Sequence, residues 1–108
     1  MTARPAIITG AADTAVGRLP GSTCMGLHAE AAALALEDAG LRRGDIDGVL
    51  CAYSFTEPHL MLASVFAEYF GLQPNFSAAI QAGGATGCIM VMQAAALVQA
   101  GMCRHVLV

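Results

Sequence analysis

The chain has 108 residues, of which 56% are hydrophobic and 12% are charged, and its formal net charge is −3. This length allows at most one domain. The low charged fraction suggests that a further domain or a partner chain covers part of the surface. The acidic balance, with no lysine and no basic run, argues against nucleic-acid binding.

The first predicted elements are a strand and a helix. Ala6–Gly10 is a short apolar run that ends in glycine, which is typical of a buried strand. After a loop, Ser22 or Thr23 can cap the first free N–H groups of a helix, and Gly40 ends that helix. The apolar stripe of this helix consists of Leu27, Ala31 and Leu34.

The middle of the chain repeats this alternation of strand and helix. Residues 48–53 form an apolar run that predicts a second strand, and Phe76–Gln81 predicts a third. Between them, Pro58 can be the first residue of a helix because it has no N–H to satisfy, and Gly71 ends this helix. The apolar stripe of this second helix consists of Leu62, Phe66 and Tyr69.

The last third of the chain predicts a helix over Cys88–Ala100 and the beginning of a fourth strand over Arg104–Val108. Strands with little polar alternation, separated by helices, predict an α/β fold with a largely parallel sheet and helices on both faces. Since nothing caps or covers the last strand, we expect residues 1–108 to be the N-terminal part of a larger, truncated domain.

Neither a membrane segment nor a metal site is predicted. The longest apolar run, residues 88–98, contains Gln93 and is shorter than the roughly 20 residues that span a bilayer. The N-terminus lacks the layout of a signal peptide, so we expect a cytoplasmic protein. The cysteines should then be free, buried, small hydrophobic residues, and their spacing fits no metal-ligand set. They are Cys24, Cys51, Cys88 and Cys103.

The most informative stretch is residues 81–88, where the third predicted strand passes through glycines into an apolar helix. Such a turn presents unpaired N–H groups and the positive end of the helix dipole. Gly83, Gly84 and Gly87 fit neither a dinucleotide fingerprint nor a phosphate loop, which also needs a lysine. The alternative interpretation is structural: glycines allow a helix and a strand to pack closely.

Three segments together resemble the N-terminal half-domain of the thiolase superfamily. They are residues 27–32 (LHAEAA), residues 45–50 (DIDGVL) and the glycine turn that enters an alanine-rich helix. The resemblance spans essentially the whole chain and is closest to the sterol-carrier-protein-type thiolases and acetyl-CoA acetyltransferases. It implies a thiolase-like half-domain of a protein with two similar α/β halves in five layers. It also implies an acyltransferase in lipid or sterol side-chain metabolism, with an acyl-CoA thioester as substrate and no further cofactor.

The most specific part of the resemblance is Gly84-Ala-Thr-Gly87, because thiolases carry Cys-Ala-Ser/Thr-Gly there. The resemblance implies that the substrate is bound by Gly83, Gly84, Ala85 and Thr86. The cysteine of the family motif is the nucleophile, whose pKa a helix N-terminus lowers. Gly84 carries no nucleophile, so Cys88, one helical turn later, is the candidate catalytic residue, unless it packs in the helix core. The histidine, asparagine and second cysteine of a thiolase site would come from a C-terminal half.

Glycine at position 84 leaves three hypotheses open. The first is an acyl-CoA acyltransferase or thiolase. The second is a thiolase-like lyase that lacks the cysteine and cleaves CoA esters by a retro-aldol reaction. The third is a non-catalytic partner subunit. Under each, the resemblance implies a homo- or hetero-oligomer that assembles through residues 76–81.

Four further side chains are weaker candidates. Glu57 and His59 lie at the predicted mouth of the second helix, where a loop residue can reach a site. Both are also ordinary residues for the start of a helix. His28, within the first predicted helix, and His105, in the last predicted strand, carry no specific signal.

Overall fold

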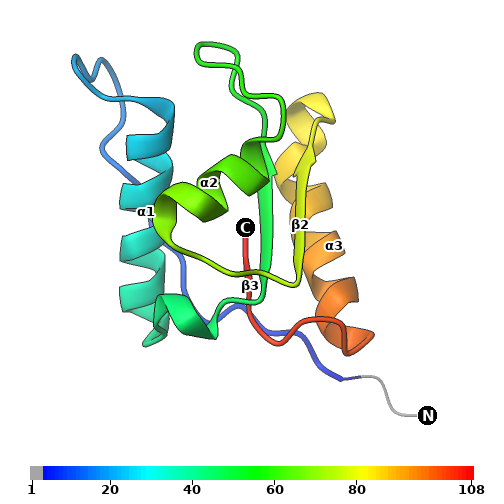
Figure 1. The fold of residues 1–108 in the computed structure, drawn as a ribbon. Helices are drawn as coiled ribbons and strands as arrows, with labels where there is room; N and C mark the ends of the chain where they lie inside the picture. Colours follow the sequence, from blue (N-terminus) through cyan, green and yellow to red (C-terminus); the bar gives the residue numbers. More distant parts are fainter. Residues whose placement is uncertain (1–3) are drawn as a thin grey trace.

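The structure, a computed structural model, describes residues 4–108 and contains a sheet of parallel strands with helices on both of its faces. The strands β1 (Gly48–Ala52), β2 (Phe76–Ile80) and β3 (Val106–Leu107) have the order β2-β1-β3. The helices are α1 (Cys24–Ala39), α2 (Leu62–Phe70) and α3 (Thr86–Gln99), and the short 3-10 helices are η1 (Arg43–Asp45) and η2 (Gly83–Ala85). Figure 1 shows α1 and α2 on one side of the sheet and α3 on the other. The predicted α/β architecture is confirmed.

The first helix begins and ends where the sequence predicts. The Thr23 hydroxyl accepts a hydrogen bond from the N–H of Gly26 at 3.0 Å, which satisfies one of the free donors of the first turn. At the other end, Gly40 has a φ of 70°, a left-handed conformation that glycine adopts without strain. Its N–H donates to carbonyls of the last turn and so closes the helix.

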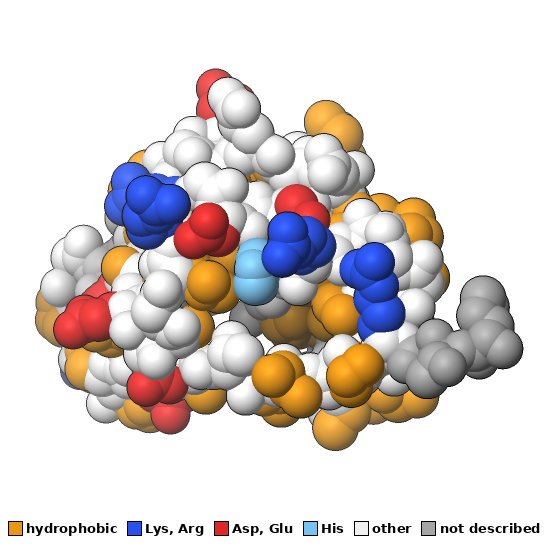
Figure 2. All heavy atoms as spheres, turned by 90° about the horizontal axis from the view of Figure 1, so that it is seen from below, with side chains coloured by type: hydrophobic (Ala, Val, Ile, Leu, Met, Phe, Trp, Pro, Cys, Tyr) orange, Lys and Arg blue, Asp and Glu red, His pale blue; other side chains and the backbone are white. Residues whose placement is uncertain are grey.

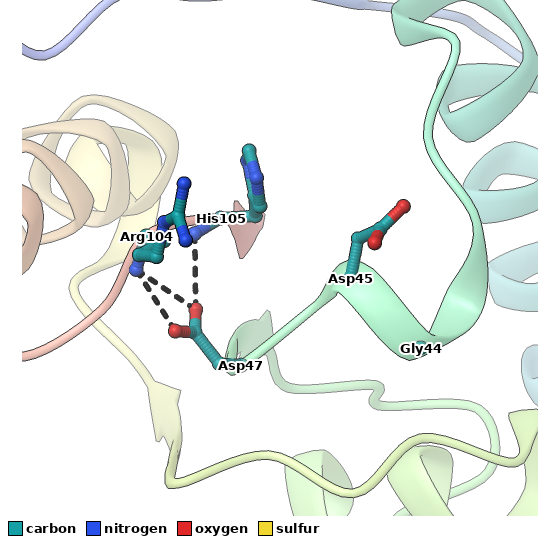
Figure 3. Close-up of a pocket in the computed structure, with 5 residues that line it drawn as sticks. All are labelled: Gly44, Asp45, Asp47, Arg104 and His105. Atoms are coloured by element: carbon teal, nitrogen blue, oxygen red, sulfur yellow. Dashed lines mark hydrogen bonds between the residues drawn. The ribbon is translucent and has the colours of Figure 1, made fainter.

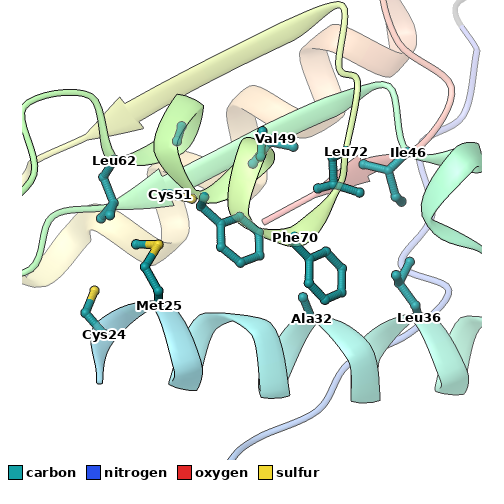
Figure 4. Close-up of a cluster of buried hydrophobic side chains, with 13 residues drawn as sticks. Cys24, Met25, Ala32, Leu36, Ile46, Val49, Cys51, Leu62, Phe70 and Leu72 are labelled. Carbon is teal, nitrogen blue, oxygen red and sulfur yellow. The ribbon is translucent and has the colours of Figure 1, made fainter. Parts of the chain in front are cut away.

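The core lies between the sheet and the two helices α1 and α2 (Figure 4). Three residues of α2 form much of this core. The rings of Phe66 and Phe70 stack with their centroids 5.4 Å apart, and Leu62 is fully buried. Val49 and Cys51 point from β1 into this cluster. The strand is buried along most of its length, as expected for the middle strand of a sheet covered on both faces.

The predicted strand at Ala6–Gly10 is wrong. This segment contains no strand, and Ile7 and Ile8 are each 79% exposed. Gly10 instead lies so close to α1 that an added Cβ would sit 2.6 Å from the carbonyl oxygen of Ala35. The strands β2 and β3 occupy both sides of β1, and the next residue of the segment, Ala11, donates its N–H to Asp38 of α1. The segment is therefore held by the helix and not by the sheet.

The second helix begins at Leu62, four residues later than the predicted start at Pro58. Leu60 is 91% exposed and Met61 62% exposed, so a helical turn here would bury little apolar surface. Residues 53–61 therefore form a loop between β1 and α2, which we call the β1–α2 loop. The end of the helix at Gly71 is as predicted, with a φ of 77°.

A single aspartate fixes the amino ends of all three strands (Figure 3). The carboxylate of Asp47 accepts hydrogen bonds from the N–H groups of Arg104 and His105 at 2.9–3.0 Å. Its main-chain carbonyl accepts from the N–H groups of Asn75 and Phe76 at the start of β2. This is why β3 begins at Val106 and not at Arg104, since the two preceding N–H groups bind a side chain in place of the sheet.

The third helix begins at Thr86, two residues before its predicted start. It contains no charged residue, yet only Thr86 and Leu97 along it are buried. A helix that is apolar on all sides is usually enclosed by protein. On α3, the apolar side chains of Ile89, Val91 and Met92 are exposed, so this helix leaves apolar surface uncovered.

Candidate functional site

The glycine turn lies at the edge of the sheet where the parallel strands end. The pairing of Ala52 with Ile80 places the ends of β1 and β2 side by side. The β1–α2 loop and η2 therefore leave the sheet from neighbouring positions, and the amino end of α1 lies at the same end of the molecule (Figure 1). Ligands of open α/β sheets bind in the crevices at this edge.

The hydroxyl of Thr86 holds the turn in shape. It accepts a hydrogen bond from the N–H of Ala82 at 2.9 Å and donates one to the carbonyl of Gly83 at 2.7 Å. Thr86 is only 8% exposed, and Gly83 has a φ of 60°. Both hydrogen bonds of the Thr86 hydroxyl lie within the turn. Thr86 would therefore affect ligand binding by fixing the shape of the turn and not by direct contact.

Two neighbouring N–H groups of the turn are free. Among residues 4–108, no group accepts a hydrogen bond from the N–H of Gly83 or of Gly84. Both residues are exposed, and they lie in the short helix η2 immediately before the 14-residue helix α3. Free N–H groups at the amino end of a helix attract negatively charged oxygen, so the turn offers a place for an oxyanion.

Gly84 is not required by the fold. An added Cβ at this position would meet no atom within 4 Å, and its φ lies outside the left-handed region, in contrast to Gly83. An added Cβ at Gly87 would also meet no atom. The structural interpretation of the glycines, close packing of helix and strand, is therefore wrong for Gly84 and Gly87, and only Gly83 is needed for its backbone conformation.

The cysteines divide into buried and exposed thiols. Cys24, Cys51 and Cys103 are buried, as predicted, and all four cysteines are free. Burial, with a smaller contribution from Cys24, raises the pKa of the Cys51 thiol to about 11. Burial, and secondly the neighbouring Asp47 carboxylate, raises the pKa of Cys103. The expectation that Cys88 is buried is wrong: it is exposed on the first turn of α3, where the apolar face of the helix is uncovered.

The weaker candidates lie at two different places. His28 of α1 has its Nδ1 2.9 Å from the carbonyl oxygen of Cys24 and its ring 5.5 Å from that of Phe66, so it is tied into the helix and the core. His59 lies in the β1–α2 loop. His105 lines a hollow at the amino ends of the strands, opposite the glycine turn (Figure 3). Charged side chains of both signs surround a histidine on this lower face (Figure 2).

The contact of Glu57 was not predicted. Its carboxylate accepts a hydrogen bond from the N–H of Cys24, the first residue of α1. The two residues are 33 positions apart, so no local pattern in the sequence could indicate this contact. The sequence predicts Glu57 in the first turn of the second helix. In the structure Glu57 lies before α2, and its side chain binds the first residue of α1.

Among residues 4–108, the structure shows neither a metal-binding cluster nor a membrane-spanning helix. No group of three or more histidine, cysteine, aspartate and glutamate side chains there could hold a metal ion. No helix in that range combines the length and the hydropathy that crossing a membrane requires.

Similarity to known proteins is found at the level of solved structures. Neither the protein-family models nor the curated protein sequences give a match. Among solved structures, the priming β-ketosynthase of the R1128 polyketide pathway superposes with a TM-score of 0.71 at 28% identity, over 82% of this chain and 27% of that chain. A variant of OleA from Xanthomonas campestris with cerulenin gives a TM-score of 0.63 at 18% identity, over 73% of this chain and 24% of that chain.

Another OleA variant, with bound lauric acid and lauroyl-CoA, gives a TM-score of 0.67 at 20% identity, over 78% of this chain and 26% of that chain. The present chain thus spans about a quarter of the length of the solved proteins it matches. The chain therefore has the fold of a thiolase-like half-domain, which it shares with ketosynthases.

Proposed function

We propose that this chain forms part of a thiolase-like protein that binds acyl-CoA thioesters and belongs to the acyl-transferring and condensing enzymes. The observation that carries this proposal is the pair of free N–H groups at Gly83 and Gly84 in front of α3. The ketosynthase and OleA neighbours support the class, and one OleA structure holds lauroyl-CoA.

The chemistry of the turn follows from these donors. The carbonyl oxygen of a thioester gains negative charge when the carbonyl carbon is attacked, or when the α-carbon loses a proton. The N–H groups of Gly83 and Gly84, with the positive end of the α3 dipole, would stabilise that charge. Gly84 cannot itself take the acyl group, so a covalent step would need another nucleophile. Cys88 is the candidate on this chain, because it is exposed one helical turn further along.

The finer assignment within this class rests on the sequence resemblance. We propose the branch of sterol-carrier-protein-type thiolases and acetyl-CoA acetyltransferases, acting in the cytoplasm on lipids or sterol side chains. The fold leaves room for a cysteine side chain at position 84, but the residue there is glycine. The missing nucleophile favours two alternatives to an acyl-enzyme mechanism. These are a lyase without the cysteine and a non-catalytic partner subunit.

Assembly is part of the proposal. The strand β2 lies at an edge of the sheet, and most of its residues are half-buried in the single chain. A free edge strand readily pairs with a strand of another chain. We therefore propose that residues 76–81 join this chain to a second copy or to a related subunit.

The binding test uses lauroyl-CoA and two glycine variants of the full chain. We expect Gly83→Ala to weaken binding about tenfold, since alanine at a φ of 60° costs roughly 1–2 kcal/mol and distorts the turn. Gly87→Ala is the matched control, because its added Cβ meets no atom. Calorimetric affinities that are equal in both variants would contradict the proposed role of the turn.

A second assay separates the three hypotheses. Thiolytic cleavage of acetoacetyl-CoA that disappears in Cys88→Ala would support Cys88 as the nucleophile of an acyltransferase. Binding of lauroyl-CoA without thiolysis would favour the lyase or the partner subunit. The absence of any binding by the folded chain would contradict the proposed function for this chain.

A further inference from the structure

The N-terminus of α1 receives a hydrogen bond from a distant acidic residue. Thr23 satisfies the N–H of Gly26, and the carboxylate of Glu57 satisfies the N–H of Cys24. The first turn of α1 contains no acidic residue of its own. Glu57 therefore supplies from the β1–α2 loop the negative charge that a helix N-terminus favours.

The β1–α2 loop has few other attachments. Its exposed apolar side chains include Phe55, which is 83% exposed, and Leu60, which is 91% exposed, so neither contributes much packing. The hydroxyl of Ser54 accepts a hydrogen bond from the N–H of Glu57, but this contact lies at the beginning of the loop and does not reach another element. The carboxylate of Glu57 thus ties the loop to a helix outside it.

The loop is also close to the glycine turn along the sheet. Ala52 and Ile80 are paired, so the chain leaves β1 into the loop and leaves β2 into the turn from adjacent positions. Because the loop starts at this edge, a loop that is released from α1 would sample positions there that the anchored loop does not reach. Where Glu57 places the loop therefore bears on access to Gly83 and Gly84.

We propose that Glu57 is a positioning residue: by capping α1, it holds the β1–α2 loop at the border of the glycine turn and keeps the site shaped for its ligand. The anchoring is a property of this fold alone. The effect on ligand binding rests on the proposed function, namely that the turn binds acyl-CoA thioesters.

The anchoring is tested by amide hydrogen exchange on the full chain. In Glu57→Ala, we expect the amides of Cys24 and of the residues of the β1–α2 loop other than Pro58 to exchange about tenfold faster, because a hydrogen bond to a charged group is lost. Glu57→Gln keeps a neutral acceptor, which binds about half as strongly, so its exchange should rise only two- to threefold. Glu68→Ala removes an exposed carboxylate of α2 and should leave these amides unchanged. The amides of α3 report on global unfolding in every variant.

The same variants are then titrated with lauroyl-CoA. We expect Glu57→Ala to bind several-fold more weakly than the wild type, and Glu57→Gln to recover most of the affinity. A role confined to the stability of α1 would not change the affinity of chains that remain folded. A loop that is released without any loss of affinity therefore overturns the positioning role.

The remaining outcomes are also decisive. Unchanged exchange at Cys24 and in the loop in both Glu57 variants overturns the anchoring itself. If Glu57→Ala does not fold, the exchange and affinity of Glu57→Gln decide in its place, and wild-type values for both overturn the proposal. If the wild-type chain binds no lauroyl-CoA, the proposed function and the effect of Glu57 on binding both fail, whereas the exchange data still decide whether Glu57 anchors the loop.

Discussion

Loss of the Asp47 side chain should weaken the sheet, because this residue ties β1 to the amino end of β3. Its carboxylate accepts from the N–H of Arg104 through both oxygens, at 3.0 and 2.9 Å, and from the N–H of His105 at 3.0 Å. A hydrogen bond to a charged group contributes roughly 1.5–3 kcal/mol when it is buried. The hydrogen bonds to Arg104 are exposed and the one to His105 is partly buried, so water can replace part of the interaction. We therefore expect Asp47→Ala to lower the free energy of unfolding by about 2–4 kcal/mol.

A second substitution tests the direction of the hydrogen bonds. In Asp47→Asn, one oxygen can still accept from Arg104 and His105, but the new amide group would replace the oxygen that lies 2.9 Å from the N–H of Arg104. Two donors would then face each other. We expect a loss of about 1–2 kcal/mol, between those of the wild type and Asp47→Ala.

The assay is urea denaturation followed by circular dichroism, with Asp45→Ala as the control. Asp45 is a near neighbour of the same charge, but its contacts are local: it accepts a hydrogen bond from the N–H of Arg42 and forms an exposed ion pair with the side chain of the same residue, so its loss should cost less than about 1 kcal/mol. If Asp47→Ala and Asp45→Ala have the same stability, Asp47 does not tie the strands together. Because small domains have only about 5–15 kcal/mol of stability, Asp47→Asn provides the measurable variant if Asp47→Ala does not fold.

Three further outcomes are expected. Because burial raises the pKa of Cys51 from 9.0 to about 11, the unfolded chain loses this proton first as the pH rises, so up to about 3 kcal/mol of stability should disappear between those pH values. Urea denaturation at several pH values should show a smaller loss in Cys51→Ala, and equal losses would contradict this assignment. In iodoacetamide labelling read by mass spectrometry, Cys88 should react first in the native chain, and in Gly84→Cys the introduced thiol should react at a lower pH than Cys88, because the amino end of α3 favours its thiolate. Labelling of the buried cysteines as fast as Cys88 would contradict the structure. Light scattering after size-exclusion chromatography should show self-association through residues 76–81, and a stable soluble monomer at micromolar concentration would contradict that proposal.

Local signals in the sequence are sufficient to predict most of the helix boundaries. Thr23 caps α1, and Gly40 and Gly71 end α1 and α2 in left-handed conformations. Each of these signals acts within one helical turn, so it can be recognised without knowing the rest of the fold. Pro58 is the exception, because a suitable first residue does not start a helix whose first turn has nothing to pack against.

Contacts between distant residues account for what the sequence does not predict. Asp47 binds N–H groups 57 and 58 positions away, and Glu57 binds one that is 33 positions away. Both residues look like ordinary polar loop residues in the sequence. The apolar run of Ala6–Gly10 has the sequence pattern of a strand but forms none. Whether such a run forms a strand depends on its pairing with an edge of the sheet, which its own sequence does not reveal.

In the candidate site, the backbone geometry requires some residues, whereas other positions could accept a different residue. Gly83 needs its left-handed conformation and Thr86 closes the turn, so both would be expected in any chain that makes this turn. Gly84 has ordinary backbone angles and open space around its α-carbon, so folding alone would accept a small side chain there. A thiolase-like catalyst would use that space for its cysteine, as the resemblance implies. Glycine keeps the two N–H donors and leaves the space in front of them empty. If the turn binds a thioester oxygen as proposed, it does so without the means to form an acyl-enzyme at position 84, which favours the lyase and the partner subunit over a thiolase.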